Sequence, residues 1–206
     1  MVLNNKFWYF DSVVSSRICD HIIKYALTHQ DNLGTIGGTK KDSSSLNRKD
    51  IKQLYKKRKS HIVWLNDRWI YKEIHPYILL ANKNAGWNFQ WDWSESCQFT
   101  KYKKGQYYGW HIDSDITPSK KEGPTKGKIR KLSSIVLLSD PSKYKGGNLQ
   151  FNFKNKELSN NIVNCKELKN RGTIVVFPSF LWHRVKSVTK GIRYSLVSWH
   201  LGYPFR

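Results

Sequence analysis

The chain has 206 residues, of which 39% are hydrophobic and 14% are aromatic. This supply of apolar side chains excludes wholesale disorder and predicts one domain, spanning residues 1–206, with a sizeable core. Lys and Arg outnumber Asp and Glu by 36 to 15, and the formal charge of +21 favours acidic partners. A solvated, lysine-rich surface without a specific partner would have the same composition.

Two other features exclude whole classes of protein. Residues 1–11 lack the basic and then apolar pattern of a secretory leader, and no stretch of about 18 apolar residues could span a membrane. We therefore expect a cytoplasmic protein. Cys19, Cys97 and Cys165 are widely spaced and contain no C-x-x-C pair, which argues against a disulfide framework or a thiolate zinc site.

Helical periodicity is confined to the first part of the chain. Apolar residues recur at helical spacing in Ser15–His29 and again in Asp67–Asn82. Pro76 is expected to kink or interrupt the second helix, because proline lacks the N–H that an interior position needs. The segment between the helices, Gly37–Lys59, is dense in Lys and Ser and is predicted to be partly loop.

After Gly86 the pattern changes to short β-branched and aromatic runs bounded by turn residues. The predicted strands are Asn88–Trp93, Cys97–Lys103, Tyr107–Asp113, Leu132–Leu138, Asn148–Phe153, Thr173–Phe177, Trp182–Val185 and Arg193–His200. Successive strands without helices between them indicate a closed or sandwiched antiparallel sheet. The predicted fold is α+β, with residues 1–86 as a mainly helical support and residues 87–206 as a jelly-roll core, that is, a double-stranded β-helix.

The first candidate ligands are His111 and Asp113. Side chains two residues apart in a strand point to the same face, so this pair would present an imidazole and a carboxylate to one small volume. Such a three-residue pattern is common by chance and gains weight only from a distant partner. His183 is that partner, because it follows a predicted strand and a short turn.

Two imidazoles and one carboxylate form the facial set of non-haem iron(II) oxygenases, which leaves three metal positions open. A 2-oxo acid can take two of them and dioxygen the third. Arg193 lies ten residues after His183, and Ser195 shares its face in the last predicted strand. A guanidinium beside a hydroxyl can hold the far carboxylate of 2-oxoglutarate. Fe²⁺, one aspartate, 2-oxoglutarate and one arginine also sum to zero charge, which lowers the penalty of burial.

Three segments carry a resemblance to a known family: YKKGQYYGWHID (Tyr102–Asp113), LSSIVLLSDPSKYKGGNLQF (Leu132–Phe151) and GTIVVFPSFLWHRVKSVTKGIRYSLVSWHLG (Gly172–Gly202). In order and spacing they resemble the iron(II)- and 2-oxoglutarate-dependent oxygenase superfamily. Within it, they are most similar to the prolyl 4-hydroxylase-like branch and its PKHD-type hydroxylases of bacteria and phages. The N-terminal half is similar more loosely, through RKSHIVWL (Arg58–Leu65).

The resemblance implies a role for each candidate residue: iron ligation for His111, Asp113 and His183, pairing with the distal carboxylate of 2-oxoglutarate for Arg193, and further hydrogen bonds to 2-oxoglutarate for Tyr102 and Ser195. A packed aromatic is the simpler interpretation of Tyr102, and Tyr107 and Tyr108 compete for its role. The implied cofactors are Fe(II), 2-oxoglutarate as co-substrate and O2, with ascorbate as a further candidate.

The function expected from this resemblance is hydroxylation of an unactivated C–H bond, with a prolyl residue of a protein or peptide as the favoured target. The charge of +21 would suit an acidic substrate. A free amino acid or small metabolite stays open as the substrate. One alternative function is oxidative demethylation of nucleic acid, although no base-flipping element is recognisable. Another is a non-catalytic basic jelly-roll module that binds nucleic acid or an acidic protein.

Overall fold

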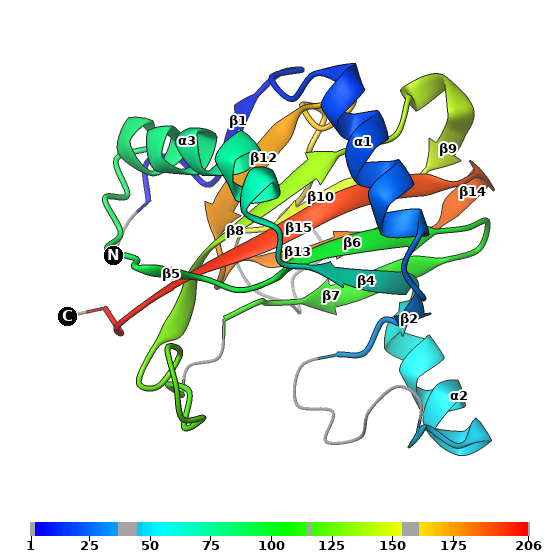
Figure 1. The fold of residues 1–206 in the computed structure, drawn as a ribbon, viewed down its shortest axis with the longest axis horizontal. Helices are drawn as coiled ribbons and strands as arrows, with labels where there is room; N and C mark the ends of the chain where they lie inside the picture. Colours follow the sequence, from blue (N-terminus) through cyan, green and yellow to red (C-terminus); the bar gives the residue numbers. More distant parts are fainter. Residues whose placement is uncertain (1–2, 37–44, 115–116, 154–160, 206) are drawn as a thin grey trace.

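The computed structural model describes residues 3–36, 45–114, 117–153 and 161–205, and these residues form two main antiparallel sheets with helices at their edges and on one face (Figure 1). The larger sheet has eight strands, in the order β1 (Trp8–Phe10), β12 (Ile174–Pro178), β8 (Ile129–Leu137), β15 (Arg193–Gly202), β6 (Cys97–Tyr102), β4 (His61–Leu65) and β2 (Asn32–Leu33), with β5 (Trp93–Ser94) paired to β15.

The smaller sheet has five strands, in the order β11 (Ile162–Asn164), β10 (Leu149–Asn152), β13 (Trp182–Val185), β7 (Tyr107–His111) and β3 (Arg58–Lys59). A separate ribbon pairs β14 (Val188–Gly191) with β9 (Tyr144–Gly146), which follows the short 3₁₀ helix η2 (Pro141–Lys143). Every strand pair is antiparallel, and most neighbours in each sheet are distant in sequence. This arrangement confirms the predicted α+β class with a jelly-roll core.

Three α-helices are described, and local sequence explains where the first two begin. Helix α1 (Ser16–Leu27) starts where the Ser15 hydroxyl accepts a hydrogen bond from the backbone N–H of Ile18. Helix α2 (Arg48–Lys57) starts with a reciprocal capping box between Asn47 and Asp50. Helix α3 (Arg68–Asn84) buries a face of residues spaced four apart, Ile70, Ile74 and Ile78.

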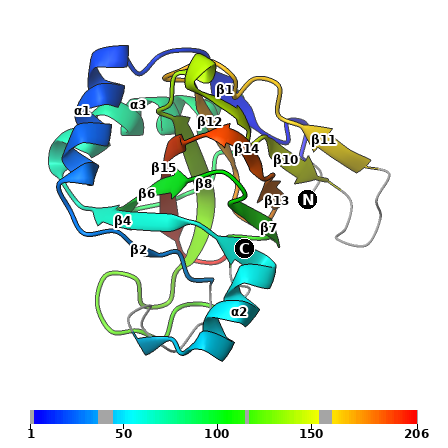
Figure 2. The ribbon, with the colours of Figure 1, turned by 90° about the vertical axis from the view of Figure 1, so that its right-hand side faces the viewer.

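The larger sheet is buried on both faces. Alternate residues of β8 and β12 point to opposite sides: Val136 and Val176 pack with α1 and α3, whereas Leu137 and Phe177 pack between the two sheets. Figures 1 and 2 show α1 and α3 lying over one side of this sheet, with α2 apart from them near β2 and β7. Burial on both faces explains the continuous apolar runs in these strands.

The first half of the chain contains elements that the sequence pattern did not predict. Strands β1 to β4 lie before residue 86 and join both sheets, so this part is more than a helical support. Within the segment Gly37–Lys59, which was predicted to be partly loop, residues 37–44 lie outside the described part, and residues 48–57 form α2. Pro76 does not interrupt α3, which continues to Asn84. Packing of the isoleucine face stabilises the helix despite the missing N–H.

The predicted strand Asn88–Trp93 is mostly a loop, with only Trp93 and Ser94 paired as β5. The side-chain amide of Asn82 replaces a strand partner, because it donates to the carbonyl of Phe89 (2.9 Å) and accepts from the Phe89 N–H (2.9 Å). Asn88 also has a positive φ of 50°, which a strand does not allow. Local side-chain bonding therefore overrides the apolar pattern of this segment.

Candidate metal centre and co-substrate site

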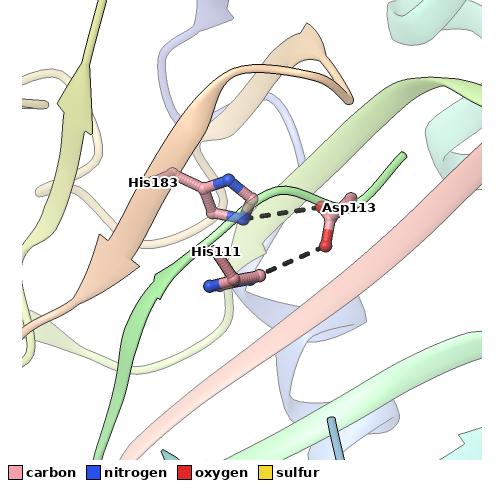
Figure 3. Close-up of side chains that lie close together, drawn as sticks. All are labelled: His111, Asp113 and His183. Atoms are coloured by element: carbon pink, nitrogen blue, oxygen red, sulfur yellow. Dashed lines mark ion pairs between the residues drawn. The ribbon is translucent and has the colours of Figure 1, made fainter. Parts of the chain in front are cut away.

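The structure brings His111, Asp113 and His183 together between β7 and β13 (Figure 3). The two histidines are register partners on neighbouring strands, and their ring centroids are 4.1 Å apart. Asp113 Oδ1 lies 3.6 Å from His111 Nε2, and Asp113 Oδ2 lies 3.5 Å from His183 Nε2. One ligand atom from each residue lies within 4.8 Å of the other two.

Asp113 reaches this cluster by a route that differs from the predicted strand alternation. Strand β7 ends at His111, so Asp113 lies in the following turn. Its backbone N–H donates to the carbonyl of Ser179 (2.9 Å), which fixes the turn against the segment between β12 and β13. The hydroxyl of Ser133 on β8 donates to Asp113 Oδ2 (2.8 Å) and also contacts the Ser179 hydroxyl (2.8 Å). Both serines therefore orient the carboxylate.

Backbone carbonyls determine the tautomers of the two histidines. His111 Nδ1 lies 2.8 Å from the carbonyl oxygen of Gly109, and His183 Nδ1 lies 3.0 Å from that of Leu181. A carbonyl can only accept, so each Nδ1 carries the hydrogen and each Nε2 presents its lone pair towards Asp113. Burial, with the neighbouring His183, lowers the pKa of His111 to about 3. The ring is therefore neutral at physiological pH.

Asp113 stays ionised in the same environment. Burial alone would raise the pKa of its carboxyl, but His183, His111 and Arg130 outweigh this and lower the pKa to about 2. The cluster thus offers two imidazole nitrogens and one carboxylate oxygen, each from a side chain that a hydrogen bond to a neighbouring group holds in place. This is the donor set of a facial iron(II) site, so the residues present fit Fe(II).

Arg193, Tyr102 and Ser195 also come together, on adjacent strands of the larger sheet. Arg193 on β15 is the register partner of Tyr102 on β6 and lies 5.8 Å from its ring. Arg193 Nη1 donates to the Ser195 hydroxyl (3.0 Å). The guanidinium is only 1% exposed. No described carboxylate forms an ion pair with it.

An unpaired guanidinium in such a place is unfavourable until an anion arrives. Gly147 leaves the room that the side chain needs, because a Cβ there would lie 2.7 Å from Arg193 Cδ. Burial raises the pKa of Tyr102, so its phenol is protonated and can donate a hydrogen bond. Together these groups present a buried guanidinium and two hydroxyls, whose chemistry suits a carboxylate.

Sequence reasoning missed several residues around the cluster. The Tyr108 ring stacks on His111, with centroids 3.6 Å apart, and the Arg58 guanidinium lies 4.4 Å above the Tyr108 ring. Arg58 is buried, and no described residue accepts a hydrogen bond from its Nη2. Arg130 pairs with Glu95 and reaches the backbone carbonyl of Asp113 (3.4 Å). Arg58 lies in the lysine-rich segment Gly37–Lys59, and Arg130 lies just before the predicted strand Leu132–Leu138. Each is an arginine next to a β-branched run, and this was the only sign of either residue in the sequence.

The amino-acid sequence matches known proteins over the part that holds this site. Residues 97–201 match the family described as the 2OG-Fe(II) oxygenase superfamily. A PKHD-type hydroxylase of Prochlorococcus marinus (strain MIT 9211) is 35% identical over 106 residues, which are 51% of this chain and 41% of that protein. A PKHD-type hydroxylase of Teredinibacter turnerae is 34% identical over 104 residues, 50% of this chain and 41% of that protein. The matches thus span about two fifths of these relatives.

Solved structures agree on the fold. A Pseudomonas putida prolyl-4-hydroxylase superposes with a TM-score of 0.66 at 16% identity, covering 96% of this chain and 93% of that one. A viral collagen prolyl hydroxylase from Paramecium Bursaria Chlorella virus-1, solved with 2OG, gives a TM-score of 0.64 at 18% identity and covers 97% of each chain. Because the matched segment contains the whole donor cluster together with Arg193, the chain belongs to the 2OG-Fe(II) oxygenase superfamily, as its motifs predicted.

Proposed function

We propose that this protein is an Fe(II)- and 2-oxoglutarate-dependent hydroxylase whose substrate is a prolyl residue in a protein or peptide. In this proposal His111, Asp113 and His183 bind the iron, while Arg193, Tyr102 and Ser195 bind the distal carboxylate of 2-oxoglutarate. The observation that carries it is the buried, unpaired guanidinium of Arg193 in the same fold as a preorganised cluster of three metal ligands. Neither feature stabilises the protein without ligands. The ligand cluster suits the iron, and the guanidinium suits the distal carboxylate of 2-oxoglutarate.

Bound iron would supply dioxygen activation coupled to the decarboxylation of 2-oxoglutarate to succinate and carbon dioxide, with hydroxylation of the substrate. The chain's own residues position the metal ligands and neutralise the charge of the bound complex. The carbonyls of Gly109 and Leu181 hold the imidazoles in the ligating tautomer, and Ser133 holds one oxygen of the carboxylate. Iron, Asp113, 2-oxoglutarate and Arg193 then sum to zero charge, which lowers the penalty of burying them. We extend the proposal to ascorbate, which would keep the iron ferrous between turnovers.

Two observations support a prolyl peptide as the substrate. Its relatives include proteins named PKHD-type hydroxylases, and the solved structures with this fold include prolyl hydroxylases. In addition, the Tyr108 ring, which stacks on His111, places an aromatic side chain and the Arg58 guanidinium beside the metal ligands. The partnerless Nη2 of Arg58 above that ring would then meet a carbonyl oxygen of the bound peptide.

The distribution of charge supports an acidic segment near the target residue. Helix α2 exposes five basic side chains and contacts β7, which carries His111: Arg48, Lys49, Lys52, Lys56 and Lys57. Such a surface raises the rate of encounter with polyanions, and its effect falls with salt. Nucleic acid is the second candidate substrate on the same ground, and a salt titration with each class of ligand separates the two.

The test has two steps. Anaerobic titration of the apo-protein with Fe(II) and then 2-oxoglutarate should produce the weak visible charge-transfer band of the iron chelate, and His183→Ala should abolish it. Aerobic incubation with prolyl peptides, with and without flanking acidic residues, should then add one oxygen atom to the peptide, detected by mass spectrometry. No band from folded protein would favour the non-catalytic binding module. A band with oxidised nucleic acid and unmodified peptides would favour the demethylase.

A further inference from the structure

A hollow of about 820 Å³ lies between the loop that follows α3 and the end of β15. Loop residues 87–92, Lys131 of β8 and residues 202–205 line it, and none of the candidate metal or co-substrate residues does. In Figure 1 the two chain segments that form its walls run side by side at the left, where the chain leaves the larger sheet. The hollow is therefore separate from the site described above.

The walls of this hollow are fixed by backbone contacts. The Asn82 side chain bonds both the N–H and the carbonyl of Phe89, at 2.9 Å each. The N–H of Asp92 donates to the carbonyl of Leu201 (2.9 Å). At Gly202 the backbones approach so closely that a Cβ would lie 2.2 Å from the carbonyl oxygen of Gln90. The loop is thus held against the last strand, and a ligand would find the hollow already formed.

Lys131 is the unusual residue in this lining. It is 5% exposed, and no described residue accepts a hydrogen bond from its ammonium or forms an ion pair with it. The nearby carboxylate of Asp92 pairs instead with Lys128, at 2.8 Å. The Lys131 ammonium lies 4.5 Å from the centroid of the Phe205 ring, and burial lowers its pKa. A cation–π contact satisfies only part of an ammonium that has three N–H donors.

Aromatic side chains supply much of the remaining lining. Trp87 and Phe89 are buried beneath it, with Phe205 edge-on to Phe89 at 4.8 Å. Tyr203 and Phe205 stay 62% and 42% exposed at the rim. Such rings offer large apolar contact to a ligand. Lys128, Lys131 and Asp92 sum to one positive charge, so a monoanion leaves the site neutral, whereas a phosphate dianion would not.

We propose that this hollow binds a monocarboxylate with an aromatic or aliphatic body. The carboxylate accepts hydrogen bonds from the Lys131 ammonium, and the body packs against Trp87, Phe89 and Phe205. A free carboxylic acid and the C-terminal residue of a peptide share this chemistry. The proposal does not depend on the metal centre and stands or falls separately from the proposed hydroxylase function.

The test is a calorimetric titration of 3-phenylpropanoate into protein loaded anaerobically with Fe(II) and saturating 2-oxoglutarate. Repeating it with Arg193→Met ensures that a carboxylate bound at Arg193 is not mistaken for one in the hollow. We expect saturable binding that Lys131→Met weakens at least about tenfold, as for the loss of one charged hydrogen bond. The matched control Lys126→Met should stay within about threefold of the wild type, because that exposed lysine pairs with Glu122 and does not line the hollow.

Two further arms complete the experiment. The neutral 3-phenylpropanamide should bind at least about tenfold more weakly than the acid, for the same reason. Phe205 is partly exposed, and Phe205→Ala should also weaken the binding of 3-phenylpropanoate. A peptide ending in Phe, compared with its C-terminal amide, distinguishes a peptide C-terminus from a free acid as the natural source. Equal affinity of wild type and Lys131→Met, or no saturable binding by either probe, would overturn the proposal.

Discussion

Replacing Arg193 with Met removes a guanidinium that is buried in the apo-protein without a carboxylate partner. The Arg193 side chain is 1% exposed, and one of its five N–H groups is used by Ser195. No described carboxylate pairs with the guanidinium, and its planar fork suits a carboxylate in the bidentate geometry that guanidinium favours. Met has a similar length and no charge, so the change removes the interaction while retaining most of the packing.

The magnitude follows from the burial. Truncating one partner of a buried, hydrogen-bonded charge pair costs about 2–5 kcal/mol, which is roughly a 30- to 4,000-fold increase in the dissociation constant of 2-oxoglutarate. The free energy of unfolding of the apo-protein should increase or stay constant, because the substitution removes a buried charge that has no ion-pair partner. One substitution should therefore weaken the co-substrate complex and not the fold.

The assay is an anaerobic titration of 2-oxoglutarate into Fe(II)-loaded protein, together with thermal unfolding of the apo-protein. Arg171→Met is the matched control, because Arg171 is also a hydrogen-bonded arginine but pairs with Asp20 at the surface. It should leave the affinity for 2-oxoglutarate unchanged. If Arg193→Met binds 2-oxoglutarate with an affinity within about threefold of the wild type, the reasoning is refuted and another residue binds the distal carboxylate.

Three other substitutions probe the centre. His183→Ala should abolish Fe(II) binding while the far-ultraviolet circular dichroism stays native, since the other strand contacts of β13 remain; tight binding of one Fe(II) would contradict the ligand assignment. Ser133→Ala removes the hydrogen bond to Asp113 Oδ2 and should weaken Fe(II) binding about 10- to 100-fold in a competitive chelator assay, with an unchanged affinity arguing against carboxylate orientation. Tyr102→Phe should raise the 2-oxoglutarate dissociation constant by about 3- to 10-fold, the effect of one hydrogen bond, and no change would assign Tyr102 to packing alone.

The sequence predicted the site better than it predicted the N-terminal half of the fold. Strand β13 matches the predicted Trp182–Val185, and β15 begins at the predicted Arg193. Residues of β13 alternate between buried and partly buried, and β15 is buried along most of its length, so each strand leaves a recognisable pattern in the sequence. Pro76 shows the converse, because tertiary packing of α3 outweighs a local rule about one residue.

Long-range hydrogen bonds account for what the sequence could not show. Asp113 lies past the end of β7, and its position depends on Ser179 and Ser133, which are 66 and 20 residues away. Nothing near Asp113 in the chain signals either partner. Arg58 was hidden for a similar reason, because its burial depends on Tyr108 and Thr35 and not on the lysines around it.

The two halves of the proposed centre rest on sheets of different exposure, which has a consequence for hydrogen exchange. Arg193 and Tyr102 belong to the larger sheet, whose central strands are covered on both faces, whereas His111 and His183 belong to the smaller sheet, where β7 and β11 are partly or fully exposed. Amide protons exchange fastest where strands open at low free energy. In the apo-protein the amides of β7 should therefore exchange before those of β15 and β6. Loss of the metal would loosen one wall of the pocket while the anchor for the co-substrate stays rigid.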